Sequence, residues 1–547
     1  MHKPDVAIIN GEIIDGTGEL GFRGHVIIDG GRIAAVVDDR KAIPEARRLI
    51  DARGRAVTPG FIDPHTHVGL YLLESPMQEV YLRQGVTSLV TGNCGSSVIP
   101  GPLSAHADYR GEPIAERLLE RGFEWEDLPG YVAALRHVGG TGPNAGVLLG
   151  HGYLRWHVMG RASLNRPMTD PEMGRALELV DEGMSQGALG MSTGLSYSPG
   201  LYADMDEVVE LLGPVREHGG VYATHIRYEG GYDFANPSSY ARAVEEALET
   251  ARRARVRLQI SHLDMGVTAD CYEIVAQARA AGQDVTVDTI PKSTGYVLDR
   301  QSTVKSLMGE CESFFNRSVE AFEEVLAKPG SHPDVAAELR DSGFLKQSPG
   351  DVLIANSGDR RLEGRTVEQA AGILGVEPNT YDVVLALLAD DRFTGGFMFG
   401  TRRDDRKPPY PLPGVMAHPF LCPGSDVIGR DVVDPFARYD VFRAGTFPIF
   451  LRYCLKRGVI LEESIRRMTS LPAHSMGISE RGLLREGYRA DVLIFDPFRL
   501  RYPILDDLNY DHPARCAEGL DWSFVNGAAV IEEGYLMGRR PGEWLGA

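Results

Sequence analysis

Between residues 59 and about 473, short β-rich runs alternate with amphipathic helical stretches, and this pattern constrains the fold more than any other feature. The β-rich runs include TSLVTGN, NAGVLLGHG, GVYATHIR and QDVTVDTI, and the helical stretches include DPEMGRALELVDEGMSQ and SYARAVEEALETARRAR. Alternation of this kind predicts parallel strands joined by crossover helices. About eight strand candidates fall in this region, which favours an α/β fold of the (β/α)8 TIM-like barrel type over an open sheet.

The two ends of the chain differ from its middle. Residues 5–58 alternate short β-rich runs with Gly/Asp turns, and the same character returns near the C-terminus in ADVLIFDP and SFVNGAAVIEEGYL. We therefore expect residues 1–58 and 476–547 to meet in one small composite β-sandwich, with the barrel at 59–475. Residues from about 298 to 365 lack the strand–helix alternation, which predicts an insertion over the active site at the barrel mouth.

Charge and cysteine content exclude several classes of partner. The formal net charge of −19 argues against nucleic acid and anionic membranes, although a local cationic pocket can still accept a small anionic substrate. The six cysteines form no CxxC pair, which is typical of reduced thiols. The sequence shows no secretory signal and no apolar run of the ~20 residues that a membrane span needs. We expect a cytoplasmic protein with a small-molecule substrate; the oligomeric state stays open.

Side chains able to bind metal stand where several predicted strands end, which in a barrel is the catalytic face. His65 and His67 follow the run AVTPGFID, and their period-two spacing points both imidazoles to the same side. Four further residues follow other predicted strands: Cys94, His225, His262 and Asp426. A lone histidine after an apolar run is more often structural. Six such residues at the ends of five predicted strands indicate a metal centre.

Taken in order, VTPGFIDPHTH, GNCG, GHGYLR, GALGMSTGLSYSPG, THIRYEG, ISHL and GSD resemble the amidohydrolase superfamily, and most closely its N-acyl-D-amino-acid deacylase (D-aminoacylase) branch. The resemblance covers nearly the whole chain. In that branch a cysteine, matched here by Cys94, replaces the carbamylated lysine of other members. The resemblance implies a zinc-dependent hydrolase of carbon–nitrogen bonds other than peptide bonds, acting on an N-acyl D-amino acid or a related N-acyl compound.

Two other functions stay open. A hydrolase of cyclic amides, as in dihydroorotase and hydantoinase relatives, would use the same metal site, but those relatives normally carry the lysine that Cys94 replaces here. A non-catalytic barrel has no need to keep six reactive side chains together.

The resemblance also assigns roles to the six residues. It implies two ligand sets: Cys94, His225 and His262 for a tight Zn²⁺, and His65, His67 and Asp426 for an adjacent position. Whether that position holds a second, weaker ion or stays weakly occupied is left open. A thiolate with two imidazoles suits zinc and leaves a fourth position open for water. Asp426 is then the catalytic residue, which accepts a proton from the attacking water and returns it to the leaving nitrogen.

Four residues are candidates for binding the substrate. Tyr197 in GLSYSPG matches a family tyrosine that faces the substrate, and His151 in GHGYLR matches another family position. The family's Tyr-Pro-Tyr is Ile-Pro-Lys here, and Phe442 stands in place of the arginine that grips a substrate carboxylate. Lys292 and Arg443 are the cations able to replace that arginine. Amide hydrolysis is therefore predicted, while the acyl group and the acid end of the substrate stay open.

Overall fold

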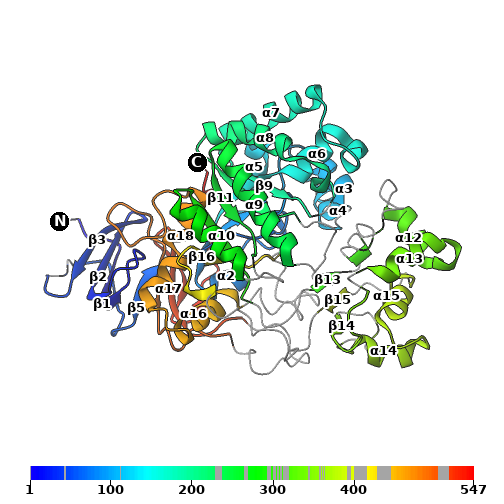
Figure 1. The fold of residues 1–547 in the computed structure, drawn as a ribbon. Helices are drawn as coiled ribbons and strands as arrows, with labels where there is room; N and C mark the ends of the chain where they lie inside the picture. The colour runs from blue at the N-terminus through cyan, green and yellow to red at the C-terminus, as the bar shows by residue number, and fades with distance from the viewer. Residues whose placement is uncertain are drawn as a thin grey trace.

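The computed structural model describes the chain except for residues 1, 42, 44, 111–112, 197, 228–236, 264–268, 292–296, 300–302, 305–306, 308–310, 312–318, 343–344, 356–358, 360, 363, 391–395, 400–414, 428–444, 503–515 and 547. The described residues form a barrel of parallel strands, a nine-stranded sheet that contains both ends of the chain, and a smaller lobe (Figure 1).

The barrel strands are β6 (Phe61–Asp63), β7 (Val86–Thr91), β8 (Asn144–Gly150), β9 (Gly190–Gly194), β10 (Val221–His225), β11 (Arg257–Ile260), β12 (Val285–Thr289) and β16 (Leu421–Pro423). They pair in this order, and each described pair is parallel. Just beyond the strands the ring closes, because Asp426 N donates to His65 O at 2.9 Å and His67 N donates to Val427 O at 2.9 Å. The predicted barrel is confirmed.

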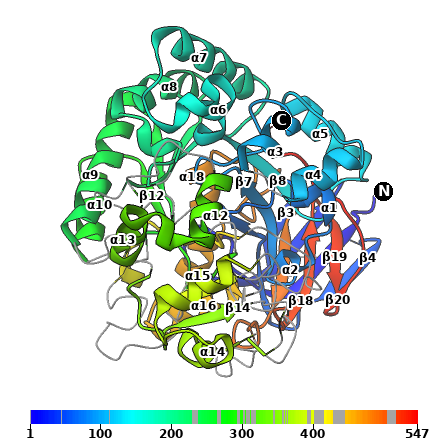
Figure 2. The same ribbon diagram turned by 90° about the vertical axis from the view of Figure 1, so that its right-hand side faces the viewer.

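Helices surround this ring (Figure 2). They are α1 (Tyr71–Glu74), α2 (Glu79–Leu82), α3 (Leu103–Arg110), α4 (Pro113–Glu120), α5 (Leu128–His137), α6 (His151–Met159), α7 (Asp170–Ser185), α8 (Met205–Glu217), α9 (Pro237–Ala254), α10 (Ala269–Ala280), α16 (Thr446–Lys456), α17 (Leu461–Met468) and α18 (Ser470–Met476). The starts of α7 and α8 follow from local sequence, since Thr169 forms a capping box with Glu172 and the Asp204 side chain accepts from Glu207 N. The barrel strands lie under this layer of helices and are almost entirely buried, including polar residues such as Thr193 of β9 and Asp288 of β12.

The second sheet joins the two ends of the chain. Its strands are β1 (Val6–Ile13), β2 (Phe22–Asp29), β3 (Arg32–Asp38), β4 (Arg48–Asp51), β5 (Ala56–Pro59), β17 (Val492–Phe495), β18 (Leu520–Val525), β19 (Ala528–Glu532) and β20 (Tyr535–Leu536). The order is β20-β19-β18-β17-β5-β1-β2-β3, with β4 beside β1. The ends meet where β5 pairs antiparallel with β17. The sheet is mixed rather than purely antiparallel, because β1 runs parallel to β4 and β5.

The smaller lobe lies to the right of the barrel in Figure 1 and faces the viewer in Figure 2. It contains β13 (Val297–Asp299), β14 (Val352–Ala355), β15 (Gly396–Phe399), α12 (Val319–Ala327), α13 (Pro333–Asp341), α14 (Val367–Leu374) and α15 (Thr380–Leu388). Its own buried core includes Phe322, Leu339 and Phe397. The lobe runs past the expected limit of 365, because β15 pairs with both β13 and β14. That it covers the barrel mouth stays a prediction.

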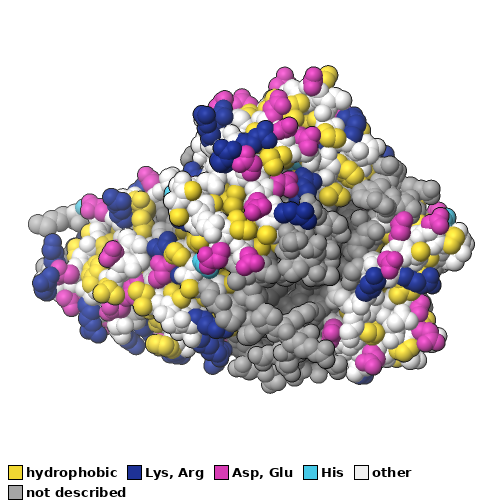
Figure 3. Space-filling view, in the orientation of Figure 1, with side chains coloured by type: hydrophobic (Ala, Val, Ile, Leu, Met, Phe, Trp, Pro, Cys, Tyr) yellow, Lys and Arg dark blue, Asp and Glu magenta, His cyan; other side chains and the backbone are white. Residues whose placement is uncertain are grey.

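The described surface is mixed in charge. On the face drawn in Figure 3, Lys and Arg side chains are interspersed with Asp and Glu over the barrel helices and the nine-stranded sheet. A search of the described helices finds none with the length and apolar character that crossing a membrane requires.

Candidate active site

The first two histidines follow β6 on a turn held by buried hydrogen bonds. The Asp63 carboxylate accepts the backbone N–H of His65 at 3.1 Å and that of Ser425 at 3.2 Å, across the seam where the barrel closes. Asn93 donates from Nδ2 to Pro64 O at 3.2 Å. His65 is fully buried, whereas the His67 side chain is 20% exposed. The turn therefore places one imidazole deep in the barrel and the other nearer its opening.

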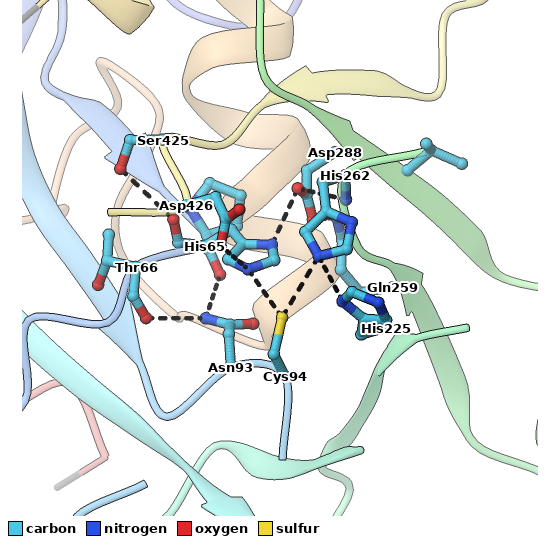
Figure 4. Close-up of polar contacts among 12 residues, drawn as sticks. His65, Thr66, Asn93, Cys94, His225, Gln259, His262, Asp288, Ser425 and Asp426 are labelled. Atoms are coloured by element: carbon cyan, nitrogen blue, oxygen red, sulfur yellow. Dashed lines mark hydrogen bonds and ion pairs between the residues drawn. The ribbon is translucent and has the colours of Figure 1, made fainter. Parts of the chain in front are cut away.

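Cys94 follows β7 and lies between two histidines (Figure 4). Its Sγ atom is 3.3 Å from His65 Nε2 and 3.4 Å from His262 Nε2. Burial alone would raise the pKa of this thiol, but the charges of His65 and His262 and hydrogen bonds from the imidazoles hold the pKa well below its usual range. Cys94 is therefore set up as a thiolate, the form that binds metal.

His225 ends β10, and His262 follows β11 by two residues. His225 Nδ1 lies 2.9 Å from His262 Nε2, and the other ring nitrogen of His225 lies 2.7 Å from the hydroxyl of Ser196. Burial lowers the pKa of His225, and the charge of His262 adds to this effect. Burial acts in the same direction on His262, but the nearby Cys94 thiolate raises its pKa to about 9. Ser196 thus occupies one nitrogen of His225 and leaves the other facing Cys94 and His262.

Asp426 follows β16, and its Oδ1 lies 3.2 Å from His65 Nε2 and 3.0 Å from His67 Nε2. Burial alone would raise the pKa of this carboxyl, but the charge of His65 and the hydrogen bonds of both imidazoles lower it well below its usual range. Asp426 is therefore ionised at neutral pH and contributes negative charge to the cluster.

The backbone at this cluster is strained. Cys94, His262 and Asp426 have φ angles of 53°, 32° and 52°, in the left-handed region that non-glycine residues rarely adopt. Of the ten described non-glycine residues with positive φ, three belong to this one site. Such strain persists only where the surroundings fix it, and it gathers at functional sites.

The residues fit a metal ion. Two groups each offer donor atoms that lie within 4.8 Å of one another: His65, His67, Cys94 and Asp426; and Cys94, His225 and His262. Tetrahedral zinc with Zn–N of about 2.0–2.1 Å and Zn–S of about 2.3 Å needs donors roughly 3.3–3.6 Å apart. The sulfur–nitrogen distances of 3.3 and 3.4 Å meet this requirement, and the 2.9 Å separation of the His225 and His262 nitrogens is a few tenths of an ångström shorter. All six predicted metal residues thus converge, and Cys94 is common to both groups.

Of the four predicted substrate residues, only His151 lies within the described part of the chain. Tyr197, Lys292 and Arg443 lie outside the described residues. His151 begins α6 but turns its Nε2 to Glu207 of α8, 3.0 Å away, and belongs to neither ligand group. Its part in substrate binding stays a prediction that no described contact supports.

Three residues near the ligands, two buried and one partly exposed, are absent from the sequence-based prediction. They are Ser196, which contacts His225, Asp288, which contacts His65, and Gln259, which contacts Asp288. Asp288 had a usable signal, since it lies in the run QDVTVDTI, near the end of a predicted strand, as the ligands do. Ser196 and Gln259 had no such signal, because the residues that they contact, His225 and Asp288, lie on other strands.

Comparison with known proteins gives consistent matches. A sequence profile of the amidohydrolase family matches residues 48–531. A D-aminoacylase of Alcaligenes xylosoxydans xylosoxydans is 32% identical over 559 residues, which cover 99% of this chain and 97% of the relative. An N-acyl-D-aspartate deacylase of the same organism is 30% identical over 556 residues, covering 99% and 95%. Among solved structures, N-acyl-D-glutamate deacylase from Bordetella bronchiseptica, complexed with zinc and a phosphonate mimic of the tetrahedral intermediate, matches with a TM-score of 0.75 and 27% identity over 100% of both chains.

Proposed function

The chain belongs to the amidohydrolase family, and on that premise we propose that it is a zinc-dependent deacylase that hydrolyses the amide bond of N-acyl D-amino acids. Two relatives at 30% identity or more along nearly its whole length are D-aminoacylase and N-acyl-D-aspartate deacylase, which supports this reaction over the opening of a cyclic amide. The substrate is therefore a small molecule with an acylated amino group.

The observation that carries the proposal is the position of Cys94. Its sulfur belongs to both groups of donor atoms and lies 3.3 Å from His65 Nε2 and 3.4 Å from His262 Nε2. In other branches of the superfamily a modified lysine takes this position. Cys94, His225 and His262 would hold the tight zinc, and His65, His67 and Asp426 would line the second position. When bound, zinc polarises a carbonyl group and lowers the pKa of water to about 7.

Asp426 supplies the proton transfers. It is ionised and lies 3.0 Å from His67 Nε2, on the more open side of the cluster. A carboxylate in this position accepts the proton that the attacking water loses and passes it to the leaving nitrogen, which must depart as a neutral amine. His65 and His67 hold Oδ1 in place during these transfers.

The test is a substrate panel for the zinc-loaded protein. It contains N-acetyl-D- and N-acetyl-L-amino acids with acidic and neutral side chains, the matching primary amides, N-acetyl amines, hydantoin and dihydroorotate. We expect release of free amine from the D-amino acid derivatives, and release slowed by about 10²–10⁴-fold in Asp426→Asn, the variant without the base. Turnover confined to the cyclic amides would contradict the proposal. Preference for a free acid over its amide would support a role for Lys292 or Arg443, the two replacement cations.

A further inference from the structure

Asp288 is a buried carboxylate that the hydrolytic scheme does not use. It lies on β12, is 0% exposed, and its Oδ1 lies 3.0 Å from Nδ1 of His65 (Figure 4). The same oxygen accepts the backbone N–H of His262 at 2.9 Å. One oxygen atom therefore contacts a residue of each proposed ligand set.

The chemistry of Asp288 fixes the orientation of His65. Asp288 Oδ1 already accepts the backbone N–H of His262, so this oxygen is an acceptor and Nδ1 of His65 is the atom that donates to it. The other ring nitrogen, Nε2, is then the atom left for a metal ion, and it faces Cys94 Sγ at 3.3 Å and Asp426 Oδ1 at 3.2 Å. The contact with Asp288 thus selects which nitrogen points into the site.

Asp288 is itself held by two further buried residues. Gln259 of β11 donates from Nε2 to Asp288 Oδ2 at 2.9 Å, and Gln259 Oε1 accepts from the hydroxyl of Ser475 in α18. Because the amide nitrogen of Gln259 donates to Asp288, its amide oxygen is left to face Ser475. A chain of directed hydrogen bonds therefore runs from α18 through two strands to His65.

The space around this contact is tight. A Cβ atom at Gly424 would lie 2.7 Å from Asp288 Oδ1 and 2.8 Å from the Cβ of His65, closer than real contacts allow. Glycine is thus required at this point for the chain after β16 to pass beside the pair.

We propose that Asp288 is a positioning residue of the metal centre: it holds His65 with Nε2 toward the second metal position and anchors the backbone of His262, so that one carboxylate sets the zinc affinity of both positions. This inference rests on the proposed zinc site but not on the proposed substrate. Carboxylate partners of metal-binding histidines fix ring orientation, and their loss weakens metal affinity by about 10–100-fold.

The experiment measures metal binding directly. The protein is stripped of metal with a chelator, and zinc dissociation constants are determined by competition with a chromophoric chelator for wild type, Asp288→Ala and Asp288→Asn. Cobalt titration with the thiolate absorption band reports the Cys94 side independently. Asp284→Asn is the matched control, because Asp284 directly precedes β12, has a 43% exposed side chain and pairs with His474, away from the ligands.

We expect Asp288→Ala to weaken zinc binding by about 10–100-fold. Asp288→Asn keeps an acceptor without the charge, and charge-assisted hydrogen bonds are about twice as strong as neutral ones, so we expect a smaller loss of at least about threefold. Asp284→Asn should bind zinc as wild type does.

A lower Tm with unchanged zinc dissociation constants in Asp288→Asn would overturn the proposal, since that result describes a purely structural residue. Asp288→Asn decides the question if Asp288→Ala does not fold. Intact zinc binding without turnover of N-acyl amino acids would contradict only the proposed function.

Discussion

The Sγ atom of Cys94 lies 3.3 Å from Nε2 of His65, although the two residues belong to different proposed ligand sets. The sulfur also lies 3.4 Å from His262 Nε2, so both groups of donors include the same thiol. The two metal positions are therefore coupled through one atom, and removing it must affect both.

The first prediction follows from this shared donor. Cys94→Ala should lose most of its bound zinc at both positions, because each group is left without its only sulfur ligand. Elemental analysis of purified protein measures zinc per chain. Cys454→Ala is the control, since Cys454 is a buried thiol of α16 outside both groups. Full zinc content in Cys94→Ala would refute the ligand assignment.

The second prediction concerns Asp426. Asp426→Asn keeps the size of the side chain but removes the base, so kcat should fall by about 10²–10⁴-fold. The tight zinc should largely remain, because Cys94, His225 and His262 are intact. Steady-state kinetics and zinc analysis of the same preparation check both statements. Turnover near that of wild type would move the proton transfer to another residue.

The third prediction is a pH dependence. Burial alone would raise the pKa of Glu207, but the hydrogen bond of His151 and the charge of Arg155 lower it from 4.5 to about 2. Because the pKa of Glu207 is lower in the folded state than in the unfolded state, its ionised form stabilises the fold above the unfolded pKa of 4.5. This stabilisation is lost as the pH falls toward 2. Breaking a buried pair costs about 3–5 kcal/mol. Glu207→Gln should thus have a lower Tm at pH 7.

The pH series makes this prediction specific. Thermal melts of wild type and Glu207→Gln should differ by a constant amount between pH 7 and pH 5 and converge below about 4.5. A difference in Tm that stays constant down to pH 3 would show that the charge of Glu207 is not its source.

The fourth prediction concerns removal of zinc. The barrel and its helices are held by a large apolar cluster to which the ligand side chains do not belong, so the stripped protein should keep its circular dichroism spectrum while losing activity. Binding at a zinc concentration 1,000 times Kd adds about 4 kcal/mol to the stability of the folded state, so Tm should rise with added zinc. Melts across a zinc series measure this effect. A Tm that does not change with zinc concentration, together with full activity after zinc has been removed, would contradict a metal centre.

The sequence predicted the barrel and the convergence of six residues because both depend on local patterns. His65 and His67 share a side through strand periodicity, and the other four follow apolar runs whose ends meet on one face of any barrel. Contacts between distant strands were not predictable in this way. Asp288 lies 223 positions from His65, and no local pattern states which carboxylate an imidazole will meet.

The end of the smaller lobe was missed for a related reason. The segment Thr380–Leu388 forms a mostly apolar, largely buried helix, and nothing in its sequence states whether it packs on the barrel or in the lobe. The strand Gly396–Phe399 is assigned to the lobe only through its pairing with Val352–Ala355. The run AVTPGFID divides into β5 and β6 around Gly60, and the two strands enter different sheets.

The pairing of β5 with β17 sets an order of events during synthesis. Val492 pairs with Pro59, about 430 residues earlier, and ribosomes add about 5–20 residues per second, so the partner of β5 emerges roughly 20–90 s after β5 itself. All four residues of β5 are buried in the finished sheet. Until β17 arrives, this edge is an unpaired apolar template of the kind that pairs wrongly with other chains. Nascent chains that stall before β17 should therefore be the species that depend most on chaperones.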